Sequence, residues 1–141
     1  MHFKYSHDLK ELSQLAVDLE AFGEENAINP AIIPCFNLCL DEVLTNIISY
    51  GYDDGPEHAA HLTLSLADEI MTAEIRDEGR AFNPLEDAPE PDLESEIEDR
   101  DIGGLGIHFC KEMMDKLEYR REGDWNILTM SKSVALPALD D

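Results

Sequence analysis

The chain has 141 residues, and 32 acidic residues against 10 lysines and arginines give it a formal net charge of −22. A field of this sign repels nucleic acid and anionic membranes, so the composition argues against both as partners. The excess of acidic residues has two possible roles: it serves solubility or salt tolerance, or it forms a surface that binds a basic partner. The 43% hydrophobic fraction is typical of a globular protein, and the length suits a single domain over residues 1–141.

The three cysteines, Cys35, Cys39 and Cys110, argue against a disulfide framework and for a reducing compartment. They could form a metal site with His108, but no paired ligand motif supports one, and we expect buried core side chains. No apolar stretch reaches membrane-spanning length, and the first residues do not resemble a signal peptide. We therefore expect a cytoplasmic location.

The first predicted elements are a strand and a helix. Phe3 and Tyr5 alternate with polar residues, which is typical of a short strand. A helix capped by Ser6 or Asp8 follows, and we expect Gly23 to end it. Its apolar positions are Leu9, Leu12, Ala16, Leu19 and Phe22.

A second helix is predicted to begin near Pro30, because proline is tolerated in a first helical turn, and to end before Gly51. Its apolar face is formed by Ile33, Phe36, Leu40, Val43, Leu44 and Ile47. Residues 62–66 and 71–75 then alternate strictly around a turn at Asp68-Glu69, which predicts a hairpin.

The periodic pattern disappears between residues 84 and 101, which contain three prolines and nine acidic residues. A loop of this length inside a compact domain is usually functional or disordered. A helix over 107–114 and two strands joined around Gly123-Asp124 follow, and residues 134–141 are predicted to be a flexible tail. The resulting order, β-α-α-β-β-loop-α-β-β, predicts an α/β (α+β) two-layer sandwich. Its helices cover one face of a mostly antiparallel, mixed sheet.

Three short motifs carry the functional signal: D-E-V-L-T-N at 41–46, D-E-G-R-A-F at 77–82 and G-G-L-G-I at 103–107. In the first, Glu42 and Asn46 are four residues apart, so a helix presents both on one face. In the second, Asp77 stands two residues before a glycine, directly after a strand. The third is predicted to open a helix, where backbone N–H groups can meet phosphate. Together these groups are what a magnesium–nucleotide site needs.

In this order the motifs resemble the N, G1 and G2 boxes of the GHKL ATPases, a superfamily that includes gyrase, histidine kinases and mismatch-repair ATPases. The longer stretches 40–52, 76–84 and 103–107 are similar to one branch, the bacterial anti-sigma-factor serine kinases of partner-switching systems. The resemblance runs from the first predicted strand to Lys132. It implies the histidine-kinase-type (Bergerat) ATP-binding fold, with ATP and Mg²⁺ as cofactors.

The resemblance also implies roles for individual residues. Glu42 would be the general base that takes the proton from an attacking hydroxyl. Asn46 would give its amide oxygen to Mg²⁺, a cation that prefers oxygen ligands. The alternative for this pair is an exposed polar helix face, which the apolar neighbours Val43, Leu44 and Ile47 make less convincing.

By the same resemblance, Asp77 would accept a hydrogen bond from the adenine amino group, and Gly79 would let the base approach the backbone. The alternative is an ordinary strand-end turn, for which Asp and Gly are common residues. The resemblance further assigns a hinge and a phosphate-facing turn to the glycines Gly103, Gly104 and Gly106, for which a plain helix N-terminus is the alternative.

Residues 84–102 would then be a lid over bound nucleotide, and either Arg80 or Arg100 could meet the terminal phosphate. The nine acidic residues of this segment should weaken ATP binding or hold the lid open, unless they face outward. The chain departs from the family pattern at Ala81, where a second glycine is common. A late-strand threonine that supports adenine in many relatives has two candidate matches here, Asn126 and Thr129.

The function implied by the resemblance is that of a Mg-ATP-dependent serine/threonine protein kinase. Its substrate would be an anti-anti-sigma protein of the STAS type, and unphosphorylated substrate would compete with a sigma factor or another regulator for this protein. The resemblance also implies a homodimer. The alternative function is a nucleotide-gated binding module that never transfers phosphate.

Overall fold

A computed structural model describes residues 1–6, 10–50, 59–79, 83 and 102–134. The elements follow one another in the predicted order, and every predicted strand and helix is present. They are β1 (His2–Ser6), α1 (Glu11–Glu25), α2 (Ile33–Tyr50), β2 (Ala59–Ala67), β3 (Ile70–Asp77), α3 (Ile102–Met113), β4 (Lys116–Glu122) and β5 (Trp125–Ser133).

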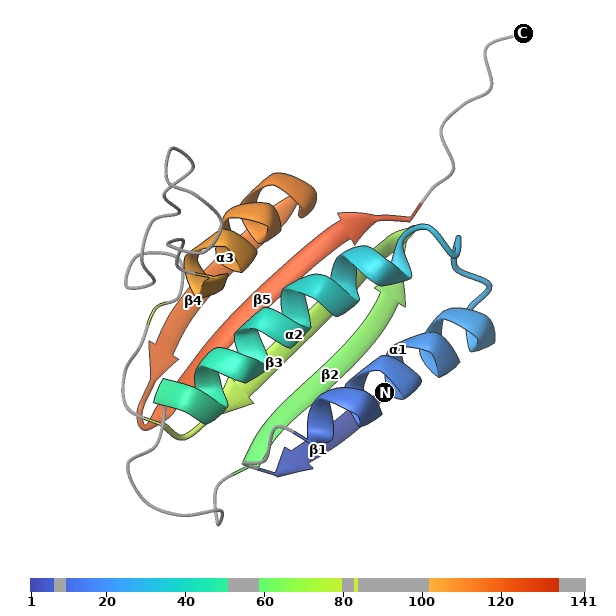
Figure 1. The fold of residues 1–141 in the computed structure, drawn as a ribbon. Helices are drawn as coiled ribbons and strands as arrows, with labels where there is room; N and C mark the ends of the chain where they lie inside the picture. Colours follow the sequence, from blue (N-terminus) through green and yellow to red (C-terminus); the bar gives the residue numbers. More distant parts are fainter. Residues whose placement is uncertain (7–9, 51–58, 80–82, 84–101, 135–141) are drawn as a thin grey trace, which may run out of the picture.

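The five strands form one sheet in the order β1-β2-β3-β5-β4, and all three helices lie on the same face of it (Figure 1). This arrangement confirms the predicted two-layer α+β fold. Each of the four strand pairs among the described residues is antiparallel, so the described sheet contains no parallel pair. None of the three described helices is both long and apolar enough to cross a membrane.

The core lies between α2 and the inner face of the sheet. Side chains on strands alternate between the two faces, so most buried apolar side chains of β2, β3 and β5 point toward the helices, whereas Ile127 of β5 lies on the other face. The side chains with no exposed area on these strands and on α2 are Leu62, Leu64, Met71, Ala73, Met130, Phe36, Cys39, Leu40 and Leu44. Full burial of a large aliphatic or aromatic side chain contributes roughly 1.5–3 kcal/mol, so this layer holds α2 firmly against the sheet.

The prediction that Gly23 ends the first helix was wrong, because α1 continues to Glu25 with Gly23 buried inside it. A Cβ atom at this position would lie 2.8 Å from Cγ1 and 2.9 Å from Cδ1 of Ile33. The glycine therefore lets the end of α1 approach the start of α2. The chain reverses just beyond it, where Ala27 has φ 53° and Ile28 N–H donates to the Gly23 carbonyl at 2.9 Å.

We expect Gly23→Ala to destabilise the protein by about 1 kcal/mol. Alanine favours a helix by about 1 kcal/mol over glycine, but overpacking against a buried side chain costs about 1–3 kcal/mol. Urea unfolding measures the difference, with Ser13→Ala on the exposed side of α1 as the control that gains helix propensity without a clash. A Gly23→Ala protein more stable than the wild type would contradict the packing role of the glycine.

Both helix starts differ in detail from the prediction. Ser6 does not cap α1, since its N–H and Oγ–H donate to Glu11 Oε1 at 3.2 and 2.7 Å, while Asp8 and Leu9 lie outside the described residues. The second helix begins at Ile33 rather than near Pro30. Asn29 causes this delay, because its side chain accepts from Ala31 N–H at 3.0 Å and its carbonyl accepts from Ile32 N–H at 2.9 Å, which forms a separate turn.

The C-terminal end of the fold extends one residue beyond the predicted boundary of the tail. Val134 packs against the core, and its N–H donates to the Glu69 carbonyl at 2.9 Å. The rest of the predicted tail, 135–141, lies outside the described residues. The turn at Asp68-Glu69 forms as predicted, with both residues at positive φ, 53° and 62°.

Candidate functional site

The buried polar side chains of the described residues gather at one end of the sheet. They are Asn46, Asp77 and Asn126, with 6%, 3% and 7% of their surface exposed. Asp77 ends β3, Asn126 pairs with it from the start of β5, and the C-terminal half of α2 lies over the same end (Figure 1). Burying polar groups is costly unless they are hydrogen-bonded, so such a cluster indicates a site.

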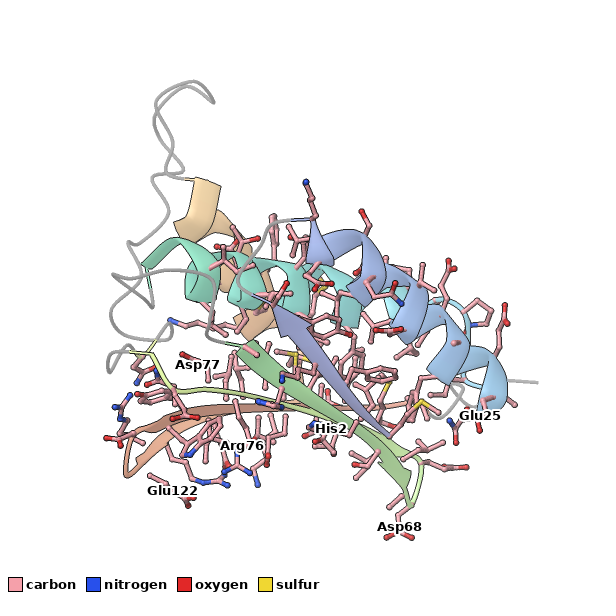
Figure 2. The ribbon with its side chains drawn as sticks, turned by 90° about the horizontal axis from the view of Figure 1, so that it is seen from below. His2, Glu25, Asp68, Arg76, Asp77 and Glu122 are labelled. Carbon is pink, nitrogen blue, oxygen red and sulfur yellow. The ribbon has the colours of Figure 1, made fainter. Side chains whose placement is uncertain are left out.

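Asp77 faces the helix layer. Figure 2 shows it on the helix side of the sheet, whereas its neighbour Arg76 lies on the opposite side. Its Oδ2 accepts a hydrogen bond from Gly79 N–H at 2.9 Å and one from Asn126 Nδ2 at 3.3 Å. The Asp-x-Gly motif is therefore a strand-end turn that also fixes the orientation of a buried carboxylate.

Two residues of β4 complete this network, and neither was predicted as a site residue. Tyr119 donates its hydroxyl proton to Asn126 Oδ1 at 2.6 Å. Arg121 Nη1 donates to the same oxygen at 3.1 Å and to the Gly79 carbonyl at 2.7 Å. The alternation of Leu117, Tyr119 and Arg121 could have revealed them, because it places an arginine on the apolar face of a strand.

Of the two candidates for the late-strand position, the structure brings Asn126 and not Thr129 to Asp77. Asn126 is the register partner of Asp77, and its Nδ2 also lies 3.4 Å from the Gly79 carbonyl. Thr129 pairs with Glu74, and its position in the alternation places it on the face away from the helices.

We expect Asn126→Ala to lower the free energy of unfolding by about 1–3 kcal/mol, because it removes the amide that joins β3 to β4 within a buried network. Chemical denaturation measures this loss. Thr129→Ala on the opposite face is the matched control and should stay within about 0.5 kcal/mol of the wild type. Equal effects of the two variants would show that the network contributes nothing particular.

On α2, Glu42 and Asn46 share one face of the helix, as predicted. Asn46 is buried, and its Nδ2 has no hydrogen-bond partner among the described residues. A buried amide donor of this kind is available to a bound group or a water molecule. Its nitrogen could donate to a phosphate oxygen or a water, and its oxygen is of the type that Mg²⁺ prefers. The donor set therefore fits a magnesium–nucleotide.

Glu42 lies one turn earlier on α2 and is half-buried. Its charge is near enough to help raise the pKa of the buried Cys110 thiol, behind the larger effects of a hydrogen bond with Cys39 and of burial. The same hydrogen bond lowers the pKa of Cys39. Both thiols are buried between α2 and α3 as expected of core cysteines, while Cys35 is half-buried.

The glycine cluster opens α3, as predicted. Gly103, Gly104 and Gly106 all lie in the first turns of this helix, whose first residue, Ile102, belonged to the predicted lid. Helix N-termini present backbone N–H groups that suit phosphate. The rest of the predicted lid, 84–101, lies outside the described residues, as do Arg80 and Ala81.

Comparison with known proteins identifies the class that this fold and cluster define. The family model described as "Histidine kinase-like ATPase domain" matches residues 5–132. The chain therefore belongs to the histidine kinase-like ATPase family, the GHKL group that the three motifs predicted.

Within this family, the chain is 36% identical over 98 residues to the serine/threonine-protein kinase BtrW of Bordetella bronchiseptica, covering 70% of this chain and 68% of that protein. It is 25% identical over 99 residues to the anti-sigma F factor of Heyndrickxia coagulans, covering 69% and 67%. These relatives confirm the resemblance to anti-sigma-factor serine kinases.

A solved structure with the same fold comprises the RsbU and RsbW domains of Rv1364c from Mycobacterium tuberculosis, with a TM-score of 0.68 at 13% identity. The match covers 98% of this chain and 33% of that one, so the chain spans about a third of the solved protein. The blue-light activated histidine kinase of Erythrobacter litoralis EL346 matches with a TM-score of 0.57 at 18% identity, covering 76% of this chain and 32% of that one. Both likenesses concern the fold.

Proposed function

We propose that the chain is a Mg-ATP-dependent serine/threonine protein kinase and anti-sigma-type regulator, and that it phosphorylates a STAS-type anti-anti-sigma partner in a bacterial partner-switching system. The observation that carries this proposal is the buried cluster of Asn46, Asp77 and Asn126, with Glu42 one turn from Asn46. A relative named as a serine/threonine-protein kinase, 36% identical over 98 residues, supports the enzyme class.

In the proposed nucleotide site, Asp77 accepts a hydrogen bond from the adenine amino group. Gly79 keeps the neighbouring backbone accessible, and the Asp77 carboxylate is already oriented by Gly79 N–H and Asn126. Asn46 would hold Mg²⁺ through its amide oxygen, and the glycine-rich start of α3 would bind the phosphates. Mg-ATP bound there would supply the phosphoryl group to the substrate hydroxyl, with ADP as the leaving group.

In the proposed chemical step, Glu42 accepts the proton of the attacking serine or threonine hydroxyl. A carboxylate within hydrogen-bond reach of that hydroxyl suits this role. Glu42 is half-buried and its Oε1 is shielded from solvent, which limits the access of water to that oxygen.

In the proposed switch, the negative charge of this chain favours release of the partner once it is phosphorylated. A phosphorylated side chain carries about −1.5 to −2 charges, which an acidic partner surface repels. Since this chain has a net charge of −22, modification of the bound partner favours its release. The released kinase, which we propose to be a cytoplasmic homodimer, is then free to sequester the sigma factor or other regulator.

The second candidate function is a nucleotide-gated binding module without phosphotransfer. The nine acidic residues of the predicted lid, 84–101, favour it, because a lid with this charge would disfavour the transfer step. Both functions need the same nucleotide site, so only the fate of the partner distinguishes them.

The deciding experiment incubates the chain with Mg-ATP and each STAS-domain protein of the host genome, and follows the intact mass of each partner. Addition of one phosphoryl group, mapped to a serine or threonine and absent with Mg-ADP, is the expected result. A partner that binds only with ATP and keeps its mass would establish the binding module instead.

A further inference from the structure

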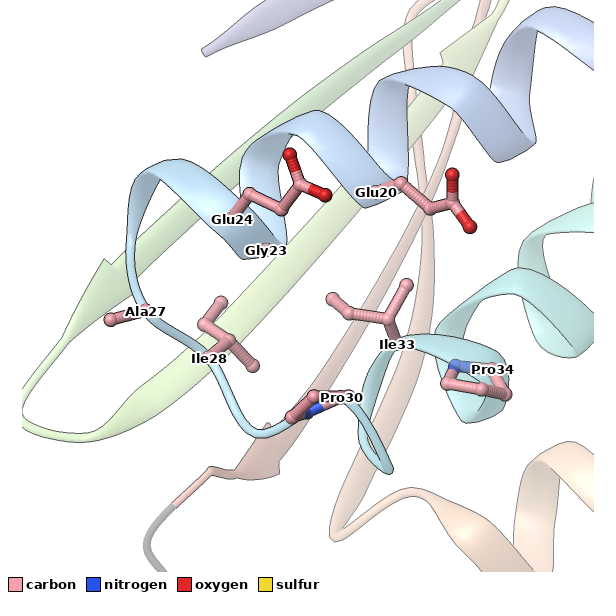
Figure 3. A pocket seen from close by; sticks show the side chains of 8 residues that line it. All are labelled: Glu20, Gly23, Glu24, Ala27, Ile28, Pro30, Ile33 and Pro34. Atoms are coloured by element: carbon pink, nitrogen blue, oxygen red, sulfur yellow. The ribbon is translucent and has the colours of Figure 1, made fainter.

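A cavity of about 440 Å³ lies between the end of α1 and the start of α2 (Figure 3). Asn46 lies near the other end of α2. Its volume falls in the range of ligand-binding pockets, roughly 300–1,000 Å³. The residues that line it are Glu20, Gly23, Glu24, Ala27, Ile28, Pro30, Ile33 and Pro34.

The loop that walls the cavity is held in shape by its own hydrogen bonds. Asn26 Nδ2 donates to the Phe22 carbonyl at 2.9 Å, and Ile28 N–H donates to the Gly23 carbonyl at 2.9 Å. Because Gly23 has no side chain, Ile33 packs directly against the α1 backbone, which brings the two walls of the cavity together. The cavity is therefore already formed in the free protein, which lowers the ordering cost of binding.

The chemistry of the cavity combines an apolar interior with two carboxylates. Ile28, Ile33 and Pro30 form the apolar side, and Glu20 and Glu24, one helical turn apart on α1, stand on the other (Figure 3). Neither carboxylate is engaged by another described residue. Such a site suits a group with an apolar stem and a cationic head, which is how lysine and arginine side chains are built.

One exposed apolar side chain on each helix lies next to the cavity. Val17 precedes Glu20 by three residues on α1 and is 57% exposed. Leu38 follows Pro34 by four residues on α2 and is 42% exposed. These spacings place each exposed side chain on the same helix face as a residue that lines the cavity. The surface is thus long enough for a peptide segment rather than for a small molecule alone.

We propose that the cavity and the α1–α2 surface next to it, formed by Val17 and Leu38, bind a basic amphipathic segment of a partner protein. One lysine or arginine side chain enters the cavity and pairs with Glu20 and Glu24, and apolar side chains of the segment cover Val17 and Leu38. The net charge of −22 steers a basic segment toward this protein and repels nucleic acid and anionic lipid.

This docking site goes beyond the proposed kinase function and does not depend on it. Ile33 and Asn46 are thirteen residues apart on α2, so the cavity lies about 20 Å along the helix from the buried polar cluster. A partner held here does not cover the cluster, and the two sites can be tested separately.

The test measures binding of the full chain to a short synthetic peptide of leucine and arginine at helical spacing. We expect Glu20→Gln with Glu24→Gln to weaken binding about fivefold, as expected for the loss of two exposed ion pairs. The matched control, Asp68→Asn with Glu69→Gln, removes the same two charges from an exposed turn and should change the affinity little.

Equal weakening by the two double variants would overturn the proposal, because it would mean that overall charge alone binds the peptide. Equally tight binding of a leucine–glutamine peptide would also overturn it. Amide chemical-shift changes should centre on Gly23, Ile28 and Ile33, and changes confined to other elements would place the peptide elsewhere. Peptide binding should persist in Asp77→Asn, which alters the proposed nucleotide site. Failure of the proposed kinase function would therefore leave the test of the docking site unaffected.

Discussion

Glu42→Gln is expected to lower phosphotransfer by about 10²–10⁴-fold while nucleotide binding stays intact. That factor is the usual contribution of a positioned general base. Glutamine keeps the size and polarity of the side chain but cannot take up a proton at neutral pH. The measurement is the single-turnover rate of phosphate transfer to the partner, together with the dissociation constant for Mg-ATP.

The matched control for this experiment is Asp41→Asn, which removes a neighbouring carboxylate from the same helix. Asp41 accepts a hydrogen bond from Thr45 Oγ1 at 3.3 Å and has no proposed catalytic role. It should retain nearly full activity. Transfer that survives in Glu42→Gln at the wild-type rate would remove Glu42 from the mechanism, even if the rest of the site is correct.

Asp77→Asn is expected to abolish stabilisation by nucleotide. A ligand at about 100 times its dissociation constant adds about 2.7 kcal/mol to the free energy of unfolding, which thermal melting detects clearly. Asparagine keeps only one acceptor oxygen, and Gly79 N–H and Asn126 Nδ2 already compete for an oxygen of Asp77. The NH₂ group that replaces the other oxygen is itself a donor, so it cannot accept the hydrogen bond from the adenine amino group.

The melts compare Mg²⁺ alone, Mg-ADP and Mg-ATP, because a chain with a net charge of −22 can bind cations without a specific site. Glu78→Gln, a change at the exposed neighbouring residue, controls for the lost charge and should keep the nucleotide-dependent shift. A full shift in Asp77→Asn would show that adenine is not bound at this carboxylate.

The sequence predicted the sheet and the core well, because both follow from local periodicity. The alternation at 62–66 and 71–75 defined the inner face of the sheet before any contact was known. The helical positions of Glu42 and Asn46, and the glycines at the start of α3, were equally predictable from spacing along the chain.

The features that the sequence did not reveal depend on contacts between distant segments. Gly23 reads as a helix stop, yet the approach of Ile33 makes it an interior position. The contribution of Arg121 to the site follows from the β4–β5 register, which places it opposite Asn126. Local pattern alone cannot supply such a register, because it is set by the turn and by the packing of both strands.

The proposed docking cavity and the buried polar cluster lie near opposite ends of α2, so mutations can alter one without altering the other. Its first turn, at Ile33 and Pro34, lines the cavity, and Asn46 near its other end belongs to the buried polar cluster. Substitutions more than about 10 Å apart without shared contacts usually have additive effects. A lineage can therefore exchange one partner for another through changes at the start of the helix, without altering the residues proposed to handle the nucleotide.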